Sequence, residues 1–196
     1  MEYFILSMFS EEEGGAIIES LPKNGPSEWK YLEGCSLKKQ FPVKASIKYS
    51  SNYPENRMLH DFVKNILRVL IVSSKVIDLI QKKGGNNVEV LPIELLDHRE
   101  EIVSDSYGIL NLIGSQDIVD MEKSKYKMSS LEKDQIKRVK KLIVSPDKVD
   151  QNSVIFRAKK MRKHIFIRED LLQLFVDNGI SGLKVYSANG WDGVDI

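Results

Sequence analysis

An internal repeat constrains the fold of this chain more than any other feature of its sequence. Residues 70–80 align without a gap with residues 165–175, which lie 95 positions later, and apolar positions match apolar positions throughout. The match continues to residues 90 and 185, whereas the polar residues differ and no candidate catalytic residue recurs. Because only the burial pattern is shared, we interpret the repeat as a folding signal. It favours a scaffold that presents a surface over an enzyme built around a pocket.

Each copy of the repeat has the pattern of a strand, a helix and a second strand. Val69–Val72 is a continuous apolar run, as expected of a strand covered on both faces. Ser73 is expected to cap the following helix, because its hydroxyl can accept a hydrogen bond from a free amide of the first turn. Gly84 and Gly179 are expected to end the two helices, since glycine adopts the left-handed conformation without a steric penalty.

Further strands are expected at residues 107–113, 117–120, 139–144 and 154–156. Two repeat units are too few for a solenoid. We therefore predict an α+β fold with antiparallel meander sheets, two related strand-helix-strand units (70–90 and 165–185) and few short helices. Residues 1–56 are predicted to form a first strand and a long loop region packed on the same domain, and residues 57–196 to contain both repeat units.

Cysteine content and apolar runs limit where the protein can work. Cys35 is the only cysteine of the 196 residues, which excludes an intramolecular disulfide and any multi-cysteine metal site. The chain shows no secretory signal, and no apolar run approaches the length of a membrane span. We expect a cytoplasmic protein with no cofactor, no metal and no membrane partner. Its oligomeric state is left open.

Positive charge is concentrated in one part of a nearly neutral chain. Residues 132–168 carry twelve Lys or Arg against four Asp or Glu, while the net charge of the whole chain is +1. Nucleic-acid binding through the basic region 137–163 is therefore an alternative function. Against it, Phe156 is the only aromatic ring nearby, and no known binding module frames the region. The exposed faces of ordinary strands would explain the same charges.

The histidines do not form a recognisable catalytic pattern. His60, His98 and His164 are widely spaced and match no metal-binding motif. The neighbouring pair His60 and Asp61 raises a third hypothesis, a hydrolase, but no nucleophile accompanies it. Cys35 has no basic neighbour closer than Lys38 and is expected to be inert. We expect that the protein is not an enzyme.

Four stretches of the chain resemble the signatures of a known family. Residues 107–112 and 117–126 resemble the middle signature of a bacterial polymorphic-toxin immunity protein family, immunity family eleven, formerly a domain of unknown function. Residues 154–172 and 178–185 are similar to its later signature. The resemblance covers roughly residues 59–186, and residues 10–56 match no pattern of that family. It implies a non-enzymatic protein that binds and neutralises a cognate toxin domain, such as a secretion-system effector used in bacterial competition.

Clusters of carboxylates are the candidate contacts with such a partner. Many toxin domains that attack nucleic acid carry positive clefts, and carboxylates would complement them. Trp191, in a glycine-flanked tail, is a candidate interface anchor, or it docks on its own domain. A solvated charged face is the simpler explanation of each acidic cluster alone. The candidate partner-binding residues are Glu11, Glu12, Glu13, Asp97, Glu100, Glu101, Asp117, Asp120, Trp191 and Asp192, with Asp195 beside the last.

Overall fold

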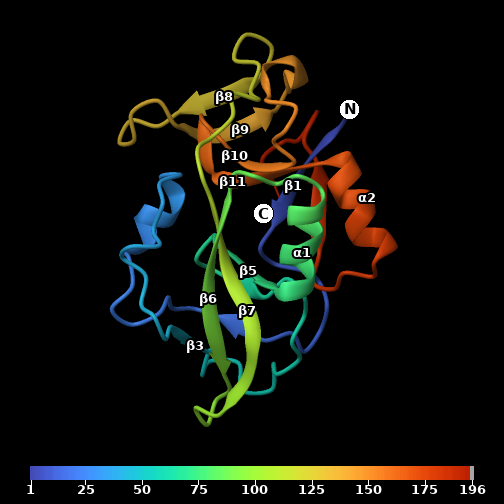
Figure 1. The fold of residues 1–196 in the computed structure, drawn as a ribbon. Helices are drawn as coiled ribbons and strands as arrows, with labels where there is room; N and C mark the ends of the chain where they lie inside the picture. The colour runs from blue at the N-terminus through green and yellow to red at the C-terminus, as the bar shows by residue number, and fades with distance from the viewer. Residues whose placement is uncertain (195–196) are drawn as a thin grey trace.

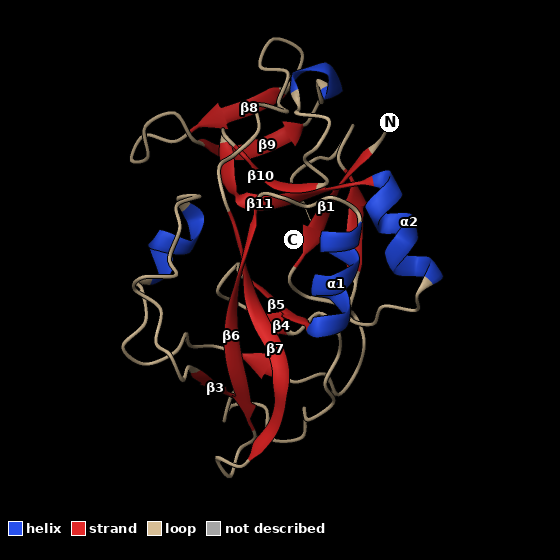
Figure 2. Cartoon of the chain, viewed as in Figure 1, coloured by secondary structure: helices blue, strands red, loops and turns tan. Residues whose placement is uncertain are grey.

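Two four-stranded sheets and two short helices form the framework of the computed structural model, in which residues 1–194 are described (Figure 1). Asp195 therefore lies outside the described residues. The helices α1 and α2 lie next to each other on one side of the sheets, and a two-stranded ribbon of β8 and β9 closes one end (Figure 2). The elements are β1 (Tyr3–Ser7), β2 (Ile17–Ile18), the 3-10 helix η1 (Glu28–Leu32), β3 (Ser46–Lys48), β4 (Lys64–Asn65), β5 (Leu70–Ser73), α1 (Ser74–Lys82), β6 (Val88–Leu96), β7 (Ile102–Leu112), β8 (Lys125–Met128), β9 (Ile136–Lys141), the 3-10 helix η2 (Pro146–Lys148), β10 (Ile155–Ala158), β11 (Met161–Arg168), α2 (Glu169–Asp177) and β12 (Lys184–Ser187).

The sheet topology agrees with the predicted α+β class but not with antiparallel meanders. The strand orders are β3-β6-β7-β5 and β10-β11-β1-β12, and β3 pairs with β6 in parallel. A meander was wrong because the chain crosses over through a helix after β5 and again after β11. Such a crossover returns the next strand parallel to the first, and here it leaves room for one antiparallel strand between them.

In the first sheet, β7 occupies that middle place. Leu70 of β5 pairs with Leu110 of β7, and Leu110 pairs on its other side with Val90 of β6. Both pairings are antiparallel, so β5 and β6 run parallel to each other with β7 between them.

In the second sheet, the N-terminal strand β1 occupies the middle place. Ile165 of β11 pairs with Leu6, which pairs on its other side with Val185 of β12. Ile165 and Val185 each stand 95 positions after their counterparts in the first sheet. The middle strands match as well, since Tyr3-Phe4-Ile5-Leu6 takes the register places of Tyr107-Gly108-Ile109-Leu110. The same pairing register therefore occurs in both sheets. In the second sheet the middle strand is β1, which comes from the other end of the chain than β11 and β12.

Local signals account for the helix ends. The Oγ of Ser73 accepts a hydrogen bond from the Val76 N–H at 3.5 Å, which confirms the predicted cap. Gly84 (φ 90°) follows α1 and Gly179 (φ 61°) follows α2, both in the left-handed region expected of helix terminators.

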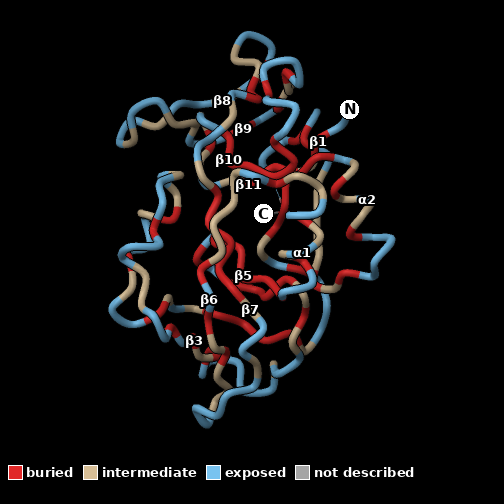
Figure 3. Tube along the Cα trace, in the orientation of Figure 1, coloured by how far each residue is buried: buried red, intermediate tan, exposed pale blue. Residues whose placement is uncertain are grey.

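The buried parts of the chain are marked along the trace in Figure 3. Their apolar side chains form three clusters, and residues at matching positions of the two repeats are divided among these clusters. Leu70 and Ile165 belong to the central cluster, which also contains the buried faces of α1 and α2. Their neighbours point the other way, because side chains alternate along a strand. Ile71 enters a cluster beside the first sheet, and Phe166 enters one beside the second. The central cluster thus joins the two sheets, and each sheet has a further core on its outer face.

The N-terminal loops complete the first outer cluster. Tyr31, Leu37 and Tyr49 are all buried there, and none of them lies in a strand. The strand expected at residues 117–120 was wrong, because that stretch makes only an isolated bridge between Val119 and Val144.

Candidate partner-binding site

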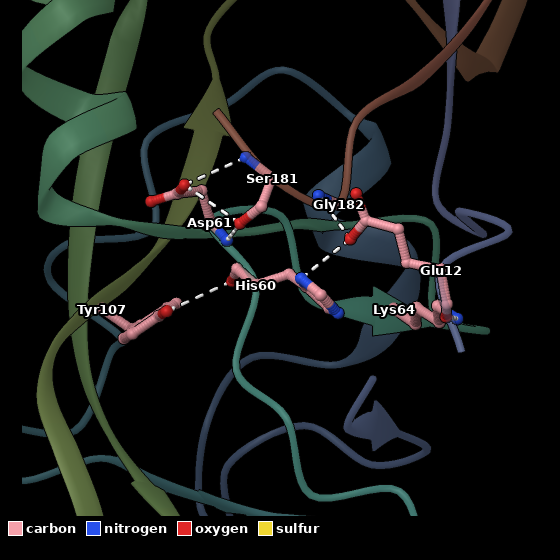
Figure 4. A network of polar contacts seen from close by, with 7 residues as sticks. All are labelled: Glu12, His60, Asp61, Lys64, Tyr107, Ser181 and Gly182. Carbon is pink, nitrogen blue, oxygen red and sulfur yellow. Dashed lines mark hydrogen bonds and ion pairs between the residues drawn. The ribbon is translucent and has the colours of Figure 1, made fainter. Parts of the chain in front are cut away.

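Glu12 lies in a polar network that connects three distant segments (Figure 4). Its Oε2 lies 2.7 Å from the Nδ1 of His60 and accepts a hydrogen bond from the Gly182 N–H at 2.9 Å. The main-chain oxygen of Glu12 accepts a hydrogen bond from Lys64, and Tyr107 donates one to the main-chain oxygen of His60 at 3.1 Å. Glu12 therefore holds the N-terminal loop against the rest of the chain, a structural role that the sequence did not indicate.

His60 and Asp61 do not form the catalytic pair considered from the sequence. The carboxylate of Asp61 points away from the imidazole and accepts hydrogen bonds from the Ser73 hydroxyl at 2.6 Å and from the Ser181 N–H at 3.0 Å. The imidazole is oriented by Glu12 instead, and its Nε2 is buried without a hydrogen-bond partner in the described chain. Among residues 1–194, no hydroxyl or thiol forms a hydrogen bond with that nitrogen as a nucleophile would.

The remaining carboxylates of the first acidic cluster are exposed. Glu11 forms an ion pair with Lys184 at 2.7 Å, and this hydrogen bond lowers the pKa of Glu11. Glu13 is exposed and makes no ion pair with any residue that the structure describes. Of this cluster, Glu13 is the carboxylate left available to a partner.

The second acidic cluster forms the turn between β6 and β7. The carboxylate of Asp97 accepts the N–H groups of Glu101 at 3.0 Å and Arg99 at 2.7 Å, and these bonds lower its pKa. Glu100 pairs with Lys48 at 3.0 Å. This turn lies at the opposite end of the molecule from β8 and β9 (Figure 1).

The third cluster lies on the connection between β7 and β8. Asp120 accepts the N–H groups of Lys123 and Glu122, both at 3.1 Å, and these bonds lower its pKa and stabilise a turn. Asp117 is exposed and has no ion pair within residues 1–194. The acidic candidate residues thus lie in separate regions of the molecule, and several of them form hydrogen bonds or ion pairs that stabilise the fold.

Trp191 docks on its own domain, which is the second of the two placements considered. Its side chain is 8% exposed, packs edge-on against His164 with ring centroids 5.3 Å apart, and donates a hydrogen bond to the main-chain oxygen of Val194 at 3.0 Å. Asp192 beside it is exposed and accepts the Val194 N–H. Burial lowers the pKa of His164 to about 4, so its ring is neutral at neutral pH.

Trp191 and His164 also line a cleft of about 740 Å³. The walls come from the end of β1 and the residues after it, from residues 65–68 and from the loop 129–135 with the start of β9. The lining includes residues 161–164 of β11. Three exposed apolar side chains stand on it: Phe9 (44% exposed), Ile66 (56%) and Leu131 (94%). We call this feature the β9–β11 cleft.

Basic side chains dominate the charge of the β9–β11 cleft. Among residues 1–194, four cations line it, namely Arg68, Lys137, Arg162 and Lys163, whereas Glu132 is the one acidic lining residue. Sequence reasoning placed the last three cations in the basic region but gave no reason to add Arg68. The apolar rim was missed as well, although isolated apolar residues in polar loops, such as Leu131 after Ser129-Ser130, are a usable signal.

Metal-binding groups, membrane-spanning helices and the single cysteine were also considered in the sequence analysis. Within residues 1–194, no group of His, Cys, Asp and Glu side chains is arranged to hold a metal ion. No helix among those residues has the length and apolar character needed to cross a membrane. Cys35 is exposed, and its thiol contacts only the main-chain oxygen of Glu33 at 3.9 Å.

Comparison with protein families assigns the chain to a family. The model of the family Immunity protein 43 matches residues 22–192, so the chain belongs to that family. This confirms the immunity protein family expected from the sequence, although the match carries the number 43 and lends no support to the number eleven. Much of residues 10–56, where no family pattern was recognised, lies inside the match. No curated protein matches the chain. Membership implies a role in toxin immunity and, in general terms, a toxin as partner.

Proposed function

We propose that this protein binds one cognate toxin domain and neutralises it by stoichiometric occlusion, without chemistry of its own. The observation that carries the proposal is the family match over residues 22–192. The polar network in Figure 4 supports a function without catalysis. Its contact between a histidine and a carboxylate, His60 with Glu12, holds two loops of the fold together. The place of action that we propose is the cytoplasm of the cell that makes the toxin.

Co-expression tests this function. The toxin encoded beside the gene is expressed from an inducible promoter in bacteria, with and without this chain, and survival is scored together with co-purification. Rescue with a 1:1 complex is expected. Continued killing without a complex would reduce the family match to a statement about shared fold.

The exposed acidic residues that form no ion pair remain candidate toxin contacts. Glu13, Glu101, Asp117 and Asp192 are exposed and form no ion pair among the residues that the structure describes. On a toxin with a basic surface they would speed association through charge complementarity. Replacing Glu13 and Asp117 with lysine is expected to slow complex formation if this surface is used.

One observation favours nucleic-acid binding as a second candidate function. Lys137, Arg138, Lys140 and Lys141 are exposed on one short strand, where they could contact a phosphate backbone. Arg157 cannot contribute directly, because it is 2% exposed. A salt-dependent mobility shift of DNA or RNA at 150 mM salt would favour this function, and the absence of a shift would remove it.

The 95-residue correspondence also supports a proposal about architecture. We propose that β5-α1-β6 and β11-α2-β12 are related units, each wrapped around a middle antiparallel strand. In the second unit, β1 takes the place that β7 takes in the first. The N-terminal strand would then complete a unit whose own middle strand is missing.

A further inference from the structure

We propose that the β9–β11 cleft is the docking site for the toxin, and that its occupant is an acidic segment of that protein with an apolar side chain as anchor. This inference rests on the proposed function and specifies which surface carries it. It differs from the interaction expected from the sequence, in which carboxylates of this chain face a basic toxin.

The surface charges of the cleft are the first argument. Glu132 lies 3.4 Å from Lys163 and 3.8 Å from Arg162, so one carboxylate serves two cations. Arg68 and Lys137 are exposed and have no ion pair within residues 1–194. The cleft therefore keeps an excess of positive charge, and an acidic segment would remove it.

A buried cation beneath the cleft is the second and independent argument. Arg157 is 2% exposed, and its guanidinium donates hydrogen bonds to the main-chain oxygens of Arg162 at 3.0 Å and Arg68 at 2.8 Å. Both of these residues line the cleft. Burial lowers the pKa of Arg157 to about 10, so it remains charged at neutral pH. No carboxylate within the described chain pairs with it, and its Nε lacks a hydrogen-bond partner.

An unpaired charge in the interior is costly because it is removed from water and receives no compensating anion. Its field also extends further than that of a surface charge, since the surrounding protein screens it weakly. An anionic group bound above Arg157 would be stabilised by it, and the excess charge of this region would be balanced in the complex.

The apolar rim points to a protein occupant rather than to nucleic acid. Leu131 is 94% exposed in the loop 129–135, and Phe9 and Ile66 come from the other two segments that wall the cleft. Exposed apolar side chains beside basic ones match a protein segment that has both carboxylates and an apolar anchor. Among the described lining residues, Phe9 carries the one exposed aromatic ring, whereas binding of single strands relies on several stacking rings.

Charge reversal at the cleft, with a matched control, tests the proposal. Lys137→Glu and Arg68→Glu change exposed side chains on two different walls, while Lys140→Glu makes the same change on β9 outside the cleft. Toxin affinity is measured by titration calorimetry for each full-length variant, after thermal unfolding has shown that all are folded. We expect each cleft variant to weaken binding at least about tenfold and Lys140→Glu to change it less than about twofold.

The other outcomes would overturn the proposal. Equal losses in all three variants would mean that only overall charge matters, and no loss in any would place the interface elsewhere. A larger loss in Glu13→Lys or Asp117→Lys would assign the interface to the acidic surface. Loss of affinity for an oligonucleotide, with toxin binding intact, would make nucleic acid the occupant. A wild-type chain that neither protects nor binds would instead refute the proposed function.

A fluorescence measurement tests the apolar part separately. Leu131→Cys and Val43→Cys are each made in a Cys35→Ser background and labelled with an environment-sensitive dye; Val43 is fully exposed in a different loop and serves as the control. Toxin binding should shift the emission of the dye at position 131 and leave that at position 43 unchanged. The opposite pattern, or no shift at either position, would contradict docking in the cleft.

Discussion

Replacing Asp61 with alanine should destabilise the fold by about 3 kcal/mol. Asp61 lies in the network of Figure 4 and joins the start of the first repeat to the end of the second. Its carboxylate accepts hydrogen bonds from the Ser73 hydroxyl at 2.6 Å, the Ser181 N–H at 3.0 Å and the Ser181 hydroxyl at 3.1 Å. Ser73 in turn caps α1.

The magnitude follows from these three contacts. A hydrogen bond to a charged group contributes roughly 1.5–3 kcal/mol, and breaking it leaves its partner unpaired. Asp61 is half-buried and both serine hydroxyls can rotate toward water, so the sum must be reduced to about 3 kcal/mol. For a chain of this size that corresponds to a fall in Tm of roughly 6–12 °C.

Urea unfolding followed by circular dichroism measures the effect. The Asp61→Ala curve should shift to lower urea with an unchanged slope, because the same surface is exposed on unfolding. Asp78→Ala on α1 is the matched control, since Asp78 is exposed and its side chain forms no hydrogen bond or ion pair within residues 1–194. It should stay within about 0.5 kcal/mol of wild type. If Asp61→Ala were equally mild, the network would not stabilise the fold and our reasoning would be wrong.

The pH dependence gives an independent check. Burial raises the pKa of Asp61, but hydrogen bonds from Ser73 and Ser181 outweigh it, so the net pKa lies below the ordinary value. A carboxyl with a lowered pKa contributes stability above the pKa of the unfolded chain, about 3.9, and loses it as the pH falls further. The difference between wild type and Asp61→Ala should therefore narrow below about pH 4. A difference that grew toward acid would contradict this assignment.

Three further predictions concern the framework. Gly182→Ala should lower the free energy of unfolding in urea by more than about 2 kcal/mol, because φ is +75° and a Cβ would lie 2.3 Å from a main-chain oxygen. Gly179→Ala, with φ +61° and open space around the Cβ, should lower it by only about 1 kcal/mol, and equal losses would refute the clash at Gly182. The hydrogen bond from Arg168 lowers the pKa of Asp170 to about 2. The wild-type protein should therefore be more stable than Asp170→Asn above about pH 4 and should lose this advantage as the pH falls toward 2. An advantage that persists in full at pH 2 would contradict this assignment. A circular permutant that begins at Ser10 and carries residues 1–9 after residue 196 through a flexible linker should fold to the native circular dichroism spectrum, and failure with several linker lengths would argue against β1 as the missing strand of the second unit.

Local signals in the sequence predicted where the two α-helices begin and end. The helix ends at Ser73, Gly84 and Gly179 were predictable because capping and left-handed turns depend on the residues at those positions. Strand pairing was not, because it depends on contacts between distant segments. Nothing near Tyr3 indicates that β1 fills the place in the second sheet that β7 fills in the first. The domain boundary after residue 56 remains a prediction.

Charge patterns did not show which acidic residues have a structural role. Glu12 and Asp97 are acidic residues near turns, and the structure uses both to hold loops in place. Sequence alone cannot separate a carboxylate that accepts main-chain hydrogen bonds from one that is free for a partner. The cleft could not be predicted from the sequence, because Phe9, Ile66 and Leu131 come from three distant segments that only the fold brings together.

Titrating the toxin with this protein tests the central claim most directly. The activity of a fixed amount of purified toxin is measured while the full-length chain is added in small steps. Stoichiometric occlusion predicts that activity falls linearly and reaches zero at one equivalent, provided the toxin concentration is far above Kd. Complete inactivation at a small fraction of an equivalent would instead reveal a catalytic mode of immunity. Undiminished activity at a large excess would contradict the account.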